Sequence, residues 1–321
     1  MSQKLTVAVL MGGPSAEHEV SLASGEVVTK SLDSEKYDTF PVIITRGGEW
    51  TIPIEEVRDK ADIAFIALHG EYGEDGTVQE LLHEAEVPYT GSDMFSSALA
   101  MNKIISARLL SSHGIKVPRF VSVHKHEKVV DPFDHFGYPI VVKPANRGSS
   151  VGMTIVRNLE ELYPALRKAF GFSRDVIIQE YVPGHEVTCP VIDDGLGDVV
   201  PLPVVEIVPR SGGSFDYHAK YTPGATDEIT PARLSEEGTE IVQRTAVAAH
   251  RAVGASGLSR TDMIIGDDGD LYVLEVNTIP GMTSNSLLPK SAQAYGLTLA
   301  ELFDRIIESG MRRHGILLRS L

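Results

Sequence analysis

Disulfide bonds, membrane spans and a basic face are all missing from this 321-residue sequence. Its single cysteine, Cys189, excludes an intramolecular disulfide, and the strand-like residues around it predict a buried thiol in the core. No apolar run approaches the ~20 residues that a membrane-spanning helix needs, and the apolar part of "MSQKLTVAVLMGG" is too short for a signal peptide. These absences favour a cytoplasmic protein in a reducing compartment.

Positive charge is also scarce in this chain. It has 29 lysines and arginines against 44 acidic residues, which gives a formal net charge of −15. Nucleic acids and anionic membranes are bound through basic surfaces, so we expect neither as a partner. A local basic pocket for a small anion stays compatible with this charge. The 42% of hydrophobic residues suits a globular protein with a complete core, and the length suits two or three lobes.

Residues 1–97 are expected to form an N-terminal doubly wound α/β lobe. Short apolar runs alternate there with helical patterns, which is typical of a parallel sheet flanked by helices. In such sheets ligands bind beyond the carboxyl ends of the strands, where Gly12-Gly13 and "HGEYGEDG" (69–76) would lie. "GGPSAEHE" is not a G-x-G-x-x-G fingerprint, so no dinucleotide site is predicted. Thr77 and Glu80 have capping-box spacing and predict the start of a helix.

Two further lobes are expected after the first. Residues 98–186 would form a small central α+β lobe, opening with one helix over "SSALAMNKIISARLLSSHG" (96–114). Residues 187–321 would form a C-terminal lobe. Its polar stretch at about 209–231 exceeds the usual limit of about 12–15 residues for structureless loops, which favours a lid over a linker. The chain closes with an amphipathic helix, which has a capping-box pair and an apolar face: Thr298 and Glu301, then Leu302, Phe303, Ile306 and Ile307.

A polar pair interrupts an apolar strand near the C-terminal end. In "DLYVLEVNTIPGMTS" (270–284), Glu275 and Asn277 lie two residues apart and therefore on one face. Asp268-Gly269 just before this strand is a strong signal for a two-residue hairpin turn. Such a turn gives the pairs Ile265–Tyr272, Asp262–Glu275 and Arg260–Asn277, with Ile264 and Val273 beside them. The four polar side chains would converge on one surface, and a slip of one residue would break the arrangement.

Three oxygen-bearing side chains, Asp262, Glu275 and Asn277, would then lie within a few ångströms of one another. Such a set suits a hard divalent cation such as Mg²⁺, which completes its shell with waters and substrate phosphates. The lack of a Cys/His cluster disfavours zinc. The alternative is a salt-bridged strand end, in which Arg260 pairs with Asp262 or Glu275.

A second stretch carries features of a phosphate site. Lys143 ends an apolar strand and precedes the Gly/Ser-rich turn Gly148-Ser149-Ser150, whose N–H groups could cradle phosphate oxygens. The alternative is an ordinary β-turn beside a surface lysine. In "VIIQEYVPGHEVT" (176–188), backbone groups could meet an adenine edge, and Glu186 could accept ribose hydroxyl hydrogens. That segment could equally be a solvated connection between lobes.

Several motifs follow one another along essentially the whole chain: "MGGPSAEHEVS", "ALHGEYGEDGTVQ", "MNKIISARLL", "VVKPANRGSSVGM", "QEYVPGHEVT", "FDYHAKY", "SRTDM" and "LEVNTIPGMTSNSLLP". In this order and spacing they resemble the D-alanine–D-alanine ligase family of the ATP-grasp superfamily. The resemblance implies an ATP-grasp fold and an enzyme that phosphorylates one D-alanine with ATP. A second D-alanine then attacks the acylphosphate to give D-alanyl-D-alanine, ADP and phosphate for peptidoglycan synthesis. Two Mg²⁺ or Mn²⁺ ions and a homodimer formed through the first lobe are also implied.

The resemblance assigns roles on the nucleotide side of the site. Asp262, Glu275 and Asn277 would hold the metal ions, Lys103 and Lys143 would pair with phosphates, and Gly148, Ser149 and Ser150 would close over them. Glu180 and Val182 would present backbone groups to adenine, Glu186 would bind the ribose, and Lys220 would approach the γ-phosphate or a substrate carboxylate when the lid closes.

It also assigns roles on the amino-acid side. Arg260 and the Gly281 N–H would form an oxyanion site, and Glu17 would anchor the first ammonium in a triad with Ser149 and Tyr221. Ser286 and the Leu287 backbone would bind the second carboxylate, and His69 would contact substrate. Without the resemblance, Glu17 would be a helix-end acid, Ser286 a helix cap, Lys103 a surface lysine and His69 a structural residue.

Two competing functions stay open. Tyr221 goes with an amine as second substrate in the family, which favours D-alanine over D-lactate. A D-alanine–D-serine or D-alanine–D-lactate ligase is the nearest alternative, and a non-catalytic nucleotide-binding regulator is the other.

Overall fold

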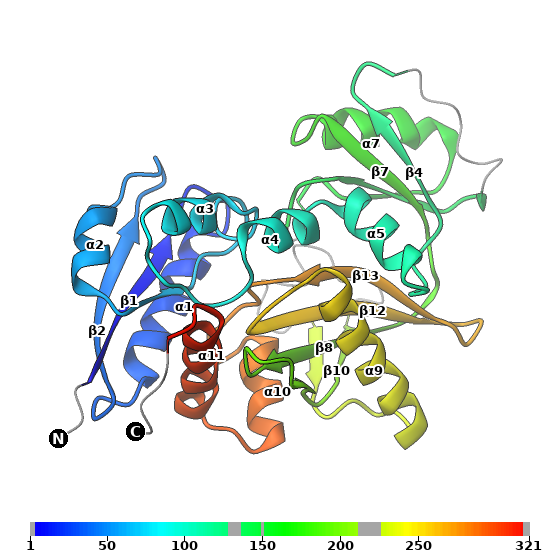
Figure 1. The fold of residues 1–321 in the computed structure, drawn as a ribbon. Helices are drawn as coiled ribbons and strands as arrows, with labels where there is room; N and C mark the ends of the chain where they lie inside the picture. The colour runs from blue at the N-terminus through cyan, green and yellow to red at the C-terminus, as the bar shows by residue number, and fades with distance from the viewer. Residues whose placement is uncertain (1–3, 128–135, 149–150, 211–225, 317–321) are drawn as a thin grey trace.

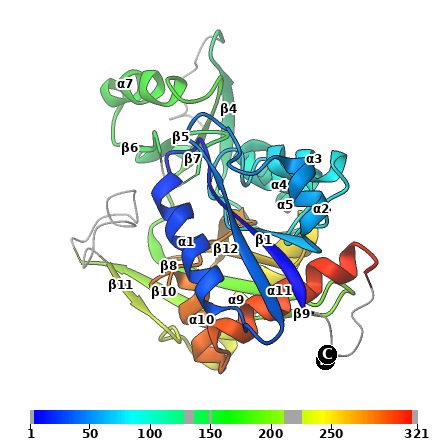
Figure 2. The ribbon, with the colours of Figure 1, turned by 90° about the vertical axis from the view of Figure 1, so that its left-hand side faces the viewer.

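The computed structural model describes residues 4–127, 136–148, 151–210 and 226–316. In these ranges the strands form three sheets, the second of which stands with helix α7 (Leu159–Phe170) at the top of the molecule in both views (Figures 1 and 2). No helix in the same ranges is long and apolar enough to cross a membrane. Four predicted site residues lie outside the described residues: Ser149, Ser150, Lys220 and Tyr221.

The first sheet is parallel, and two of its three strands are largely buried. Its strands are β2 (Tyr37–Ile44), β1 (Leu5–Gly12) and β3 (Ile63–Ile66) in spatial order, and its flanking helices include α1 (His18–Ser31), α2 (Ile54–Lys60) and α3 (Thr77–Glu84). Every residue of β3 and the last six of β1 are buried, as in parallel strands covered on both faces. The predicted α/β arrangement is confirmed.

Helix α3 begins at the predicted residue, Thr77, but a different side chain accepts its first N–H group. No side chain caps it from Gly76, the residue before the helix, whose φ is 96°. Instead Asp75 Oδ1 accepts the Thr77 N–H at 3.0 Å. The capping box predicted from Thr77 and Glu80 was therefore wrong, because Thr77 is already the first helical residue.

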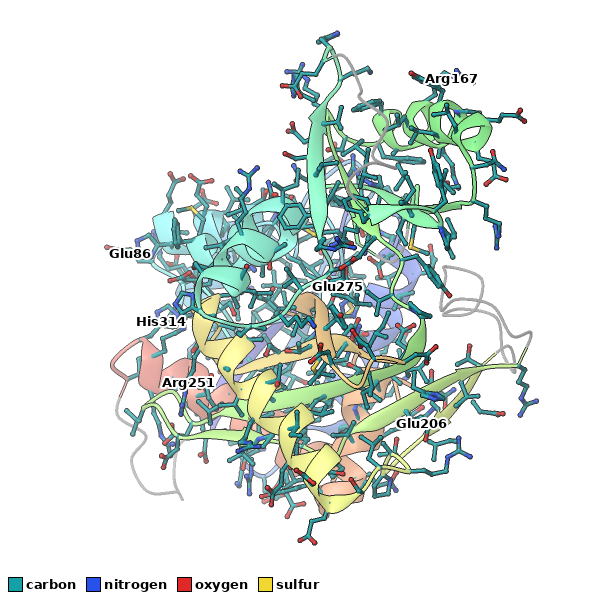
Figure 3. All side chains as sticks on the ribbon, turned by 90° about the vertical axis from the view of Figure 1, so that its right-hand side faces the viewer. Glu86, Arg167, Glu206, Arg251, Glu275 and His314 are labelled. Atoms are coloured by element: carbon teal, nitrogen blue, oxygen red, sulfur yellow. The ribbon has the colours of Figure 1, made fainter. Side chains whose placement is uncertain are left out.

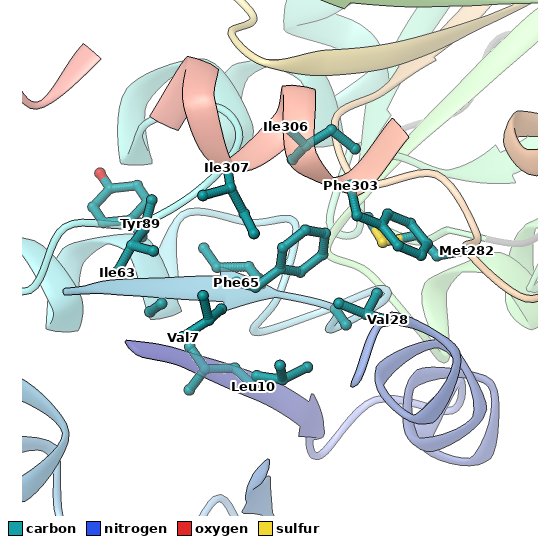
Figure 4. Close-up of a cluster of buried hydrophobic side chains, with 14 of the residues drawn as sticks. Val7, Leu10, Val28, Ile63, Phe65, Tyr89, Met282, Phe303, Ile306 and Ile307 are labelled. Carbon is teal, nitrogen blue, oxygen red and sulfur yellow. The ribbon is translucent and has the colours of Figure 1, made fainter. Parts of the chain in front are cut away.

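The closing helix α11 (Leu299–Arg313) packs on the first sheet, at the other end of the sequence (Figure 4). Its predicted capping box is present, with the Glu301 N–H donating to Thr298 Oγ1 at 3.2 Å and the Thr298 N–H donating to the Glu301 carboxylate at 2.8 Å. Phe303 meets Phe65 of β3 edge to face, with ring centroids 5.7 Å apart. The first sheet thus takes part of its core from the end of the chain, and the lobe boundaries drawn from sequence stay predictions.

One predicted helix proved to be two. α4 (Met94–Met101) and α5 (Lys103–Ser112) are separated by Asn102, whose backbone is extended at φ −80° and ψ 99°. The Asn102 side chain accepts the N–H groups of Ile104 and Ile105, both at 3.1 Å. Capping by Asn102 favours the start of a new helix over continuation of α4, so the prediction of one continuous helix was wrong.

The second sheet is antiparallel and forms the central α+β lobe. Its strands are β4 (Phe120–His124), β7 (Asp175–Glu180), β5 (Ile140–Pro144) and β6 (Thr154–Val156), in that spatial order. α7 covers the sheet with buried Leu162 and Leu166. The predicted strand–turn–strand after Lys143 is confirmed as the β5–β6 hairpin.

The third sheet lies below, with α9 (Glu236–Ala252) on it and α10 (Leu287–Tyr295) nearby. Its spatial order is β11 (Thr226–Ile229), β10 (Val205–Pro209), β8 (Gly184–Asp193), β12 (Leu258–Gly266) and β13 (Leu271–Asn277), while β9 (Val199–Pro201) pairs with β8. Cys189 is buried on β8, as predicted, and burial raises the pKa of its thiol. The predicted lid stretch contains β11, so its end is strand and not loop.

The β12–β13 hairpin keeps the predicted polar pairs. Arg260 pairs with Asn277, and Asp262 pairs with Glu275. The turn itself is longer than predicted: the Gly266 N–H donates to the Asp270 carbonyl at 2.8 Å, and Gly269 has a φ of 84°. The loop therefore has three residues. A β-bulge between Asp262 and Met263 restores the register of the polar pairs.

That bulge changes which apolar residues lie beside the polar pairs. Ile265 pairs with Leu271 and Ile264 with Tyr272, one position away from the prediction. Met263 pairs with Val273, which turns into the core, while Leu274 lines a cavity with Ile264. Placing Val273 beside the polar cluster was therefore wrong, because Leu274 is the extra residue of the bulge.

Candidate active site

Asp262 is the centre of a buried polar cluster at the end of the hairpin. It accepts two hydrogen bonds from Arg260, from Nε and Nη2, both at 2.8 Å. Asn277 Nδ2 donates to it at 3.1 Å, and Thr188 Oγ1 on the neighbouring β8 donates at 2.6 Å. Only 5% of Asp262 is exposed, so these partners replace the water that a carboxylate loses on burial. The salt-bridged strand end that the sequence left open is present here.

Glu275 lies beside this cluster and is paired with a lysine from another lobe. Lys103 Nζ lies 2.8 Å from Glu275 Oε2, and the two side chains are only 10% and 17% exposed. Lys103 also donates to the Arg147 carbonyl at 2.9 Å, next to the Gly-rich turn. Figure 3 shows Glu275 in the interior, between the central lobe and the third sheet. Because its side chain is mostly buried, Lys103 is not a surface lysine. It is the first residue of α5, which begins after the helix break at Asn102.

The donor set fits a divalent cation of the magnesium type. Two carboxylates and an amide converge, and two cationic side chains balance them in this structure. Among the described residues no three His, Cys, Asp or Glu side chains gather as ligands, so a metal here would use the Asn277 amide as well. All three groups offer oxygen, which Mg²⁺ and Mn²⁺ accept.

A narrow cavity of about 110 Å³ runs from this cluster between the second and third sheets. It brings together five residues predicted to bind ATP: Lys103, Lys143, Glu180, Val182 and Glu186. Met153 and Leu274 add apolar surface of the kind that an aromatic base needs. The Glu180 N–H already donates to the Arg119 carbonyl at 2.9 Å, so its carbonyl is the backbone group left for a base.

A larger cavity of about 680 Å³ lies on the other side of the same ion pair. It is lined by the residues predicted for the amino-acid side: Glu17, His69, Arg260, Gly281, Ser286 and Leu287. Lys103 and Glu275 line both cavities. The two cavities therefore meet at the Lys103–Glu275 ion pair.

Glu17 lies just before α1, at the residue that precedes the first helical turn. A Cβ built on Gly148 would lie 3.3 Å from Glu17 Oε2, and one built on Gly70 would lie 2.9 Å from it. The Gly-rich turn of the central lobe thus approaches the Glu17 carboxylate closely. The predicted triad partners Ser149 and Tyr221 lie outside the described residues.

His69 is held by the protein on both ring nitrogens. Nδ1 donates to the Ile279 carbonyl at 3.1 Å, and Nε2 bonds with Ser24 Oγ at 2.8 Å. Burial lowers the pKa of His69, so the ring is neutral near pH 7. This geometry favours the structural role that the sequence left as the alternative, although the ring also faces the larger cavity.

The loop from Thr278 to Ser286 closes the far side of the larger cavity. Gly281 leaves no room for a side chain, because an added Cβ would lie 2.8 Å from Ser286 Oγ. Ser286 stands at the N-cap position of α10, but its hydroxyl bonds with Thr283 Oγ1 at 2.8 Å and does not cap the helix. The helix N-terminus therefore keeps N–H groups without an intrahelical partner, Leu287 among them.

Two polar features of this cavity were missed from sequence. Glu74 accepts the Gly70 N–H at 2.8 Å, and burial, followed by repulsion from Glu17, raises its pKa to about 8. Lys290 of α10 pairs with Glu228 of β11 at 2.5 Å. The acidic run in "HGEYGEDG" was the available signal for Glu74, whereas the second pair depends on a strand within the predicted loop.

The fold and the site together define a class. Two lobes with antiparallel sheets enclose a narrow cavity that ends in carboxylates and lysines, which is the arrangement of an ATP-grasp enzyme. A family model described as "D-ala D-ala ligase C-terminus" matches residues 109–308, and one described as "D-ala D-ala ligase N-terminus" matches residues 6–61 and 52–92.

Individual relatives agree over almost the full length. The chain is 44% identical to a D-alanine–D-alanine ligase of Geobacter sulfurreducens, covering 94% of this chain and 93% of that protein. The crystal structure of the D-alanine–D-alanine ligase of Bacillus anthracis complexed with ATP has 36% identity and a TM-score of 0.82, covering 97% and 99%. The VanG D-Ala:D-Ser ligase of Enterococcus faecalis has 34% identity and a TM-score of 0.86, covering 96% and 100%. This chain belongs to the D-alanine–D-alanine ligase family.

Proposed function

We propose that this protein joins two D-alanine molecules in a reaction driven by ATP. A carboxylate oxygen of the first D-alanine takes the γ-phosphoryl group, and ADP leaves. The neutral amine of the second D-alanine then attacks the acylphosphate carbon, phosphate leaves with the C–O electrons, and the nitrogen loses one proton and keeps one N–H in the new amide. The observation that carries the proposal is the meeting of the two cavities at the Lys103–Glu275 pair.

On the nucleotide side, charge complementarity supports the assignments. Lys103 and Lys143 would neutralise phosphate oxygens, and the Gly148 turn with Ser149 and Ser150 would close over them. Glu180 and Val182 would meet the adenine edge and Glu186 the ribose, while Lys220 would approach the γ-phosphate. Asp262, Glu275 and Asn277 would hold two Mg²⁺ or Mn²⁺ ions, which when bound would act as Lewis acids on the phosphoryl oxygens.

On the amino-acid side, the carboxylate of Glu17 would bind the first ammonium, and Ser149 and Tyr221 would complete its hydrogen-bonded triad. Arg260 and the Gly281 N–H would stabilise the oxyanion that develops as the amine attacks. The N-terminal turn of α10, with Ser286 and the Leu287 N–H, would bind the second carboxylate, because a helix N-terminus favours an anion. His69 would contact substrate only with the ring edge that its partners leave open.

The second substrate has one serious competitor. The solved relative from Enterococcus faecalis is a D-Ala:D-Ser ligase and matches this chain with a TM-score of 0.86. D-serine differs from D-alanine by one hydroxyl, and a pocket discriminates weakly against such an addition. D-alanine remains the proposed second substrate, with D-serine as the alternative.

The setting of the reaction follows from its chemistry. ATP as a substrate and the single buried cysteine support a cytoplasmic enzyme. The product would serve peptidoglycan synthesis, and the family resemblance supports a homodimer.

The test is phosphate release from ATP, coupled to mass spectrometry of the product. D-alanine alone should support turnover and give the dipeptide, while L-alanine should not. Offering D-serine or D-lactate with limiting D-alanine ranks the second substrates. The absence of D-alanine-dependent phosphate release from folded protein with Mg²⁺ would refute the function, and a larger yield of D-alanyl-D-serine would select the alternative.

A further inference from the structure

Glu74 joins two loops on opposite sides of the larger cavity. Its Oε1 accepts the Gly70 N–H at 2.8 Å, and its own N–H donates to the Gly70 carbonyl at 2.8 Å. Burial raises the pKa of the Glu74 carboxyl group, and the nearby Ile279 N–H acts in the opposite direction. Glu74 thus links the loop after β3 with the loop after β13.

The Ile279 segment is anchored at several points by the first lobe. The His69 ring, next to the Gly70 N–H that Glu74 accepts, donates to the Ile279 carbonyl at 3.1 Å. Three residues later, the Met282 N–H donates to Ser24 Oγ at 3.3 Å. Gly281 lies between these anchors, so the direction of its N–H depends on His69 and Ser24 of the first lobe.

Glu74 also acts on the second oxyanion group by charge. Burial lowers the pKa of Arg260, but the neighbouring carboxylates raise it above its ordinary value, Asp262 most strongly and then Glu275 and Glu74. Arg260 is already held by Asp262 through two hydrogen bonds. The same glutamate therefore faces both groups that would meet the oxyanion.

We propose that Glu74 is a positioning residue for the ligation step, which fixes the Gly281 N–H through the Ile279 peptide and orients Arg260 by its charge. This rests on the proposed function, since it concerns the oxyanion site of that reaction. Preorganised donors stabilise a transition state only when they already point at the developing charge. Glu74 should consequently affect the rate of the step more than the binding of either substrate.

The ionisation of Glu74 gives this role a pH dependence. Burial and the nearby Glu17 raise its pKa to about 8, against the opposing effects of the Gly70 N–H, Arg260 and the Ile279 N–H. The charged and titratable groups that face it are Glu17 from the start of α1, His69 from its own loop and Arg260 from β12. The ionised carboxylate is the better acceptor for two N–H groups, so its contribution to rate should rise as the pH passes through about 8.

The test is Glu74→Gln, which keeps the shape but turns one acceptor oxygen into an N–H donor. At about pH 9, where the wild-type carboxylate is ionised, we expect kcat to fall by about 10–100-fold, because a misdirected oxyanion donor costs up to that much. KM for D-alanine and for ATP should change by less than about threefold, since ground-state contacts are kept. The inflection near pH 8 in kcat/KM of the wild type should disappear. Glu80→Gln, on the exposed face of α3, is the matched control and should behave as wild type.

Unchanged kcat in Glu74→Gln, or a higher KM at normal kcat, would overturn the proposal. If that variant fails to fold by thermal unfolding, Glu74→Asp decides the matter: it keeps the charge, withdraws the carboxylate by one methylene, and should keep the pH inflection at reduced kcat. Wild-type kcat in Glu74→Asp would then overturn the proposal. Wild-type protein in the same assay must release phosphate on adding D-alanine, so failure of the proposed function is seen separately.

Discussion

Replacing Glu275 by glutamine tests the ion pair at which the two cavities meet. The Lys103–Glu275 pair contributes to stability and, under the proposed function, to catalysis. The structure predicts a small loss of stability and a large loss of turnover. Glutamine keeps an oxygen that can accept from Lys103 but removes the charge that would hold a metal ion. The two losses can therefore be measured in one variant.

The structural loss should be small. A hydrogen bond to a charged group contributes about 1.5–3 kcal/mol, and both side chains are mostly buried, at 10% and 17% exposure. Because Lys103 retains the Arg147 carbonyl at 2.9 Å, the lower end of that range applies. A loss of about 1.5 kcal/mol lowers Tm by about 2 °C in a protein of 321 residues. Loss of a metal ligand removes several kcal/mol of charge stabilisation, so turnover should fall about a thousandfold.

Thermal unfolding and D-alanine-dependent phosphate release, each over a range of Mg²⁺ concentrations, measure the two losses. The matched control is Glu26→Gln, which breaks the exposed pair with Lys30, 2.9 Å apart and 64% and 74% exposed. That control should change neither quantity, since such surface pairs contribute little. A Glu275→Gln protein with the small drop in Tm but turnover within tenfold of wild type would show that the carboxylate serves packing and not the metal.

Three further substitutions test other parts of the reasoning. Asn102→Ala removes the cap of α5, which should lower the free energy of unfolding by about 1 kcal/mol and weaken ATP binding, as urea denaturation and calorimetric titration would show. Gly281→Ala places a Cβ 2.8 Å from Ser286 Oγ and should cut kcat at least about tenfold with an unchanged circular dichroism spectrum; normal kcat would remove Gly281 from the oxyanion site. Burial tends to raise the pKa of Asp193, but the His250 ring at 3.1 Å and two further hydrogen bonds hold it below its usual value. Its stabilisation is therefore full above about pH 4 and lost as the pH falls through the lower folded-state pKa, so Asp193→Asn should lose about 2 kcal/mol at pH 7 and progressively less in acid; an equal loss at every pH in urea denaturation would contradict this.

The β12–β13 hairpin shows how much of the structure could be predicted from local sequence patterns. Asp268-Gly269 located the turn to within one residue, and the period of two placed Asp262 opposite Glu275. The loop length and the bulge at Leu274 were both missed, and the two errors cancelled at the polar pairs while displacing Val273 and Tyr272. Bulges leave no reliable mark in a single sequence, because any residue can occupy one when its neighbours pack well.

Contacts between segments that are distant in the sequence could not be predicted from such local patterns. Nothing around Lys103 indicates that it faces Glu275, because the lysine enters the interior only through the break at Asn102. Thr188 reaches Asp262 because β8 and β12 are neighbours in the sheet, and strand order depends on the whole chain. The amphipathic face of the closing helix was evident, but the sheet that receives it was not. Residues whose roles came from the family resemblance, such as Glu17, still depend on it.

The docking of α11 on β1 and β3 has a consequence for how the chain is made. A ribosome adds about 5–20 residues per second, so the 232 residues between Ile66, which ends β3, and Leu299, which begins α11, correspond to about 12–46 s of synthesis. During that interval the apolar side of the nascent sheet around Phe65 stays uncovered, because Phe303 and Ile307 have not yet been synthesised. A fragment released before residue 299 would keep that side uncovered for good, and it should be a strong client for chaperones.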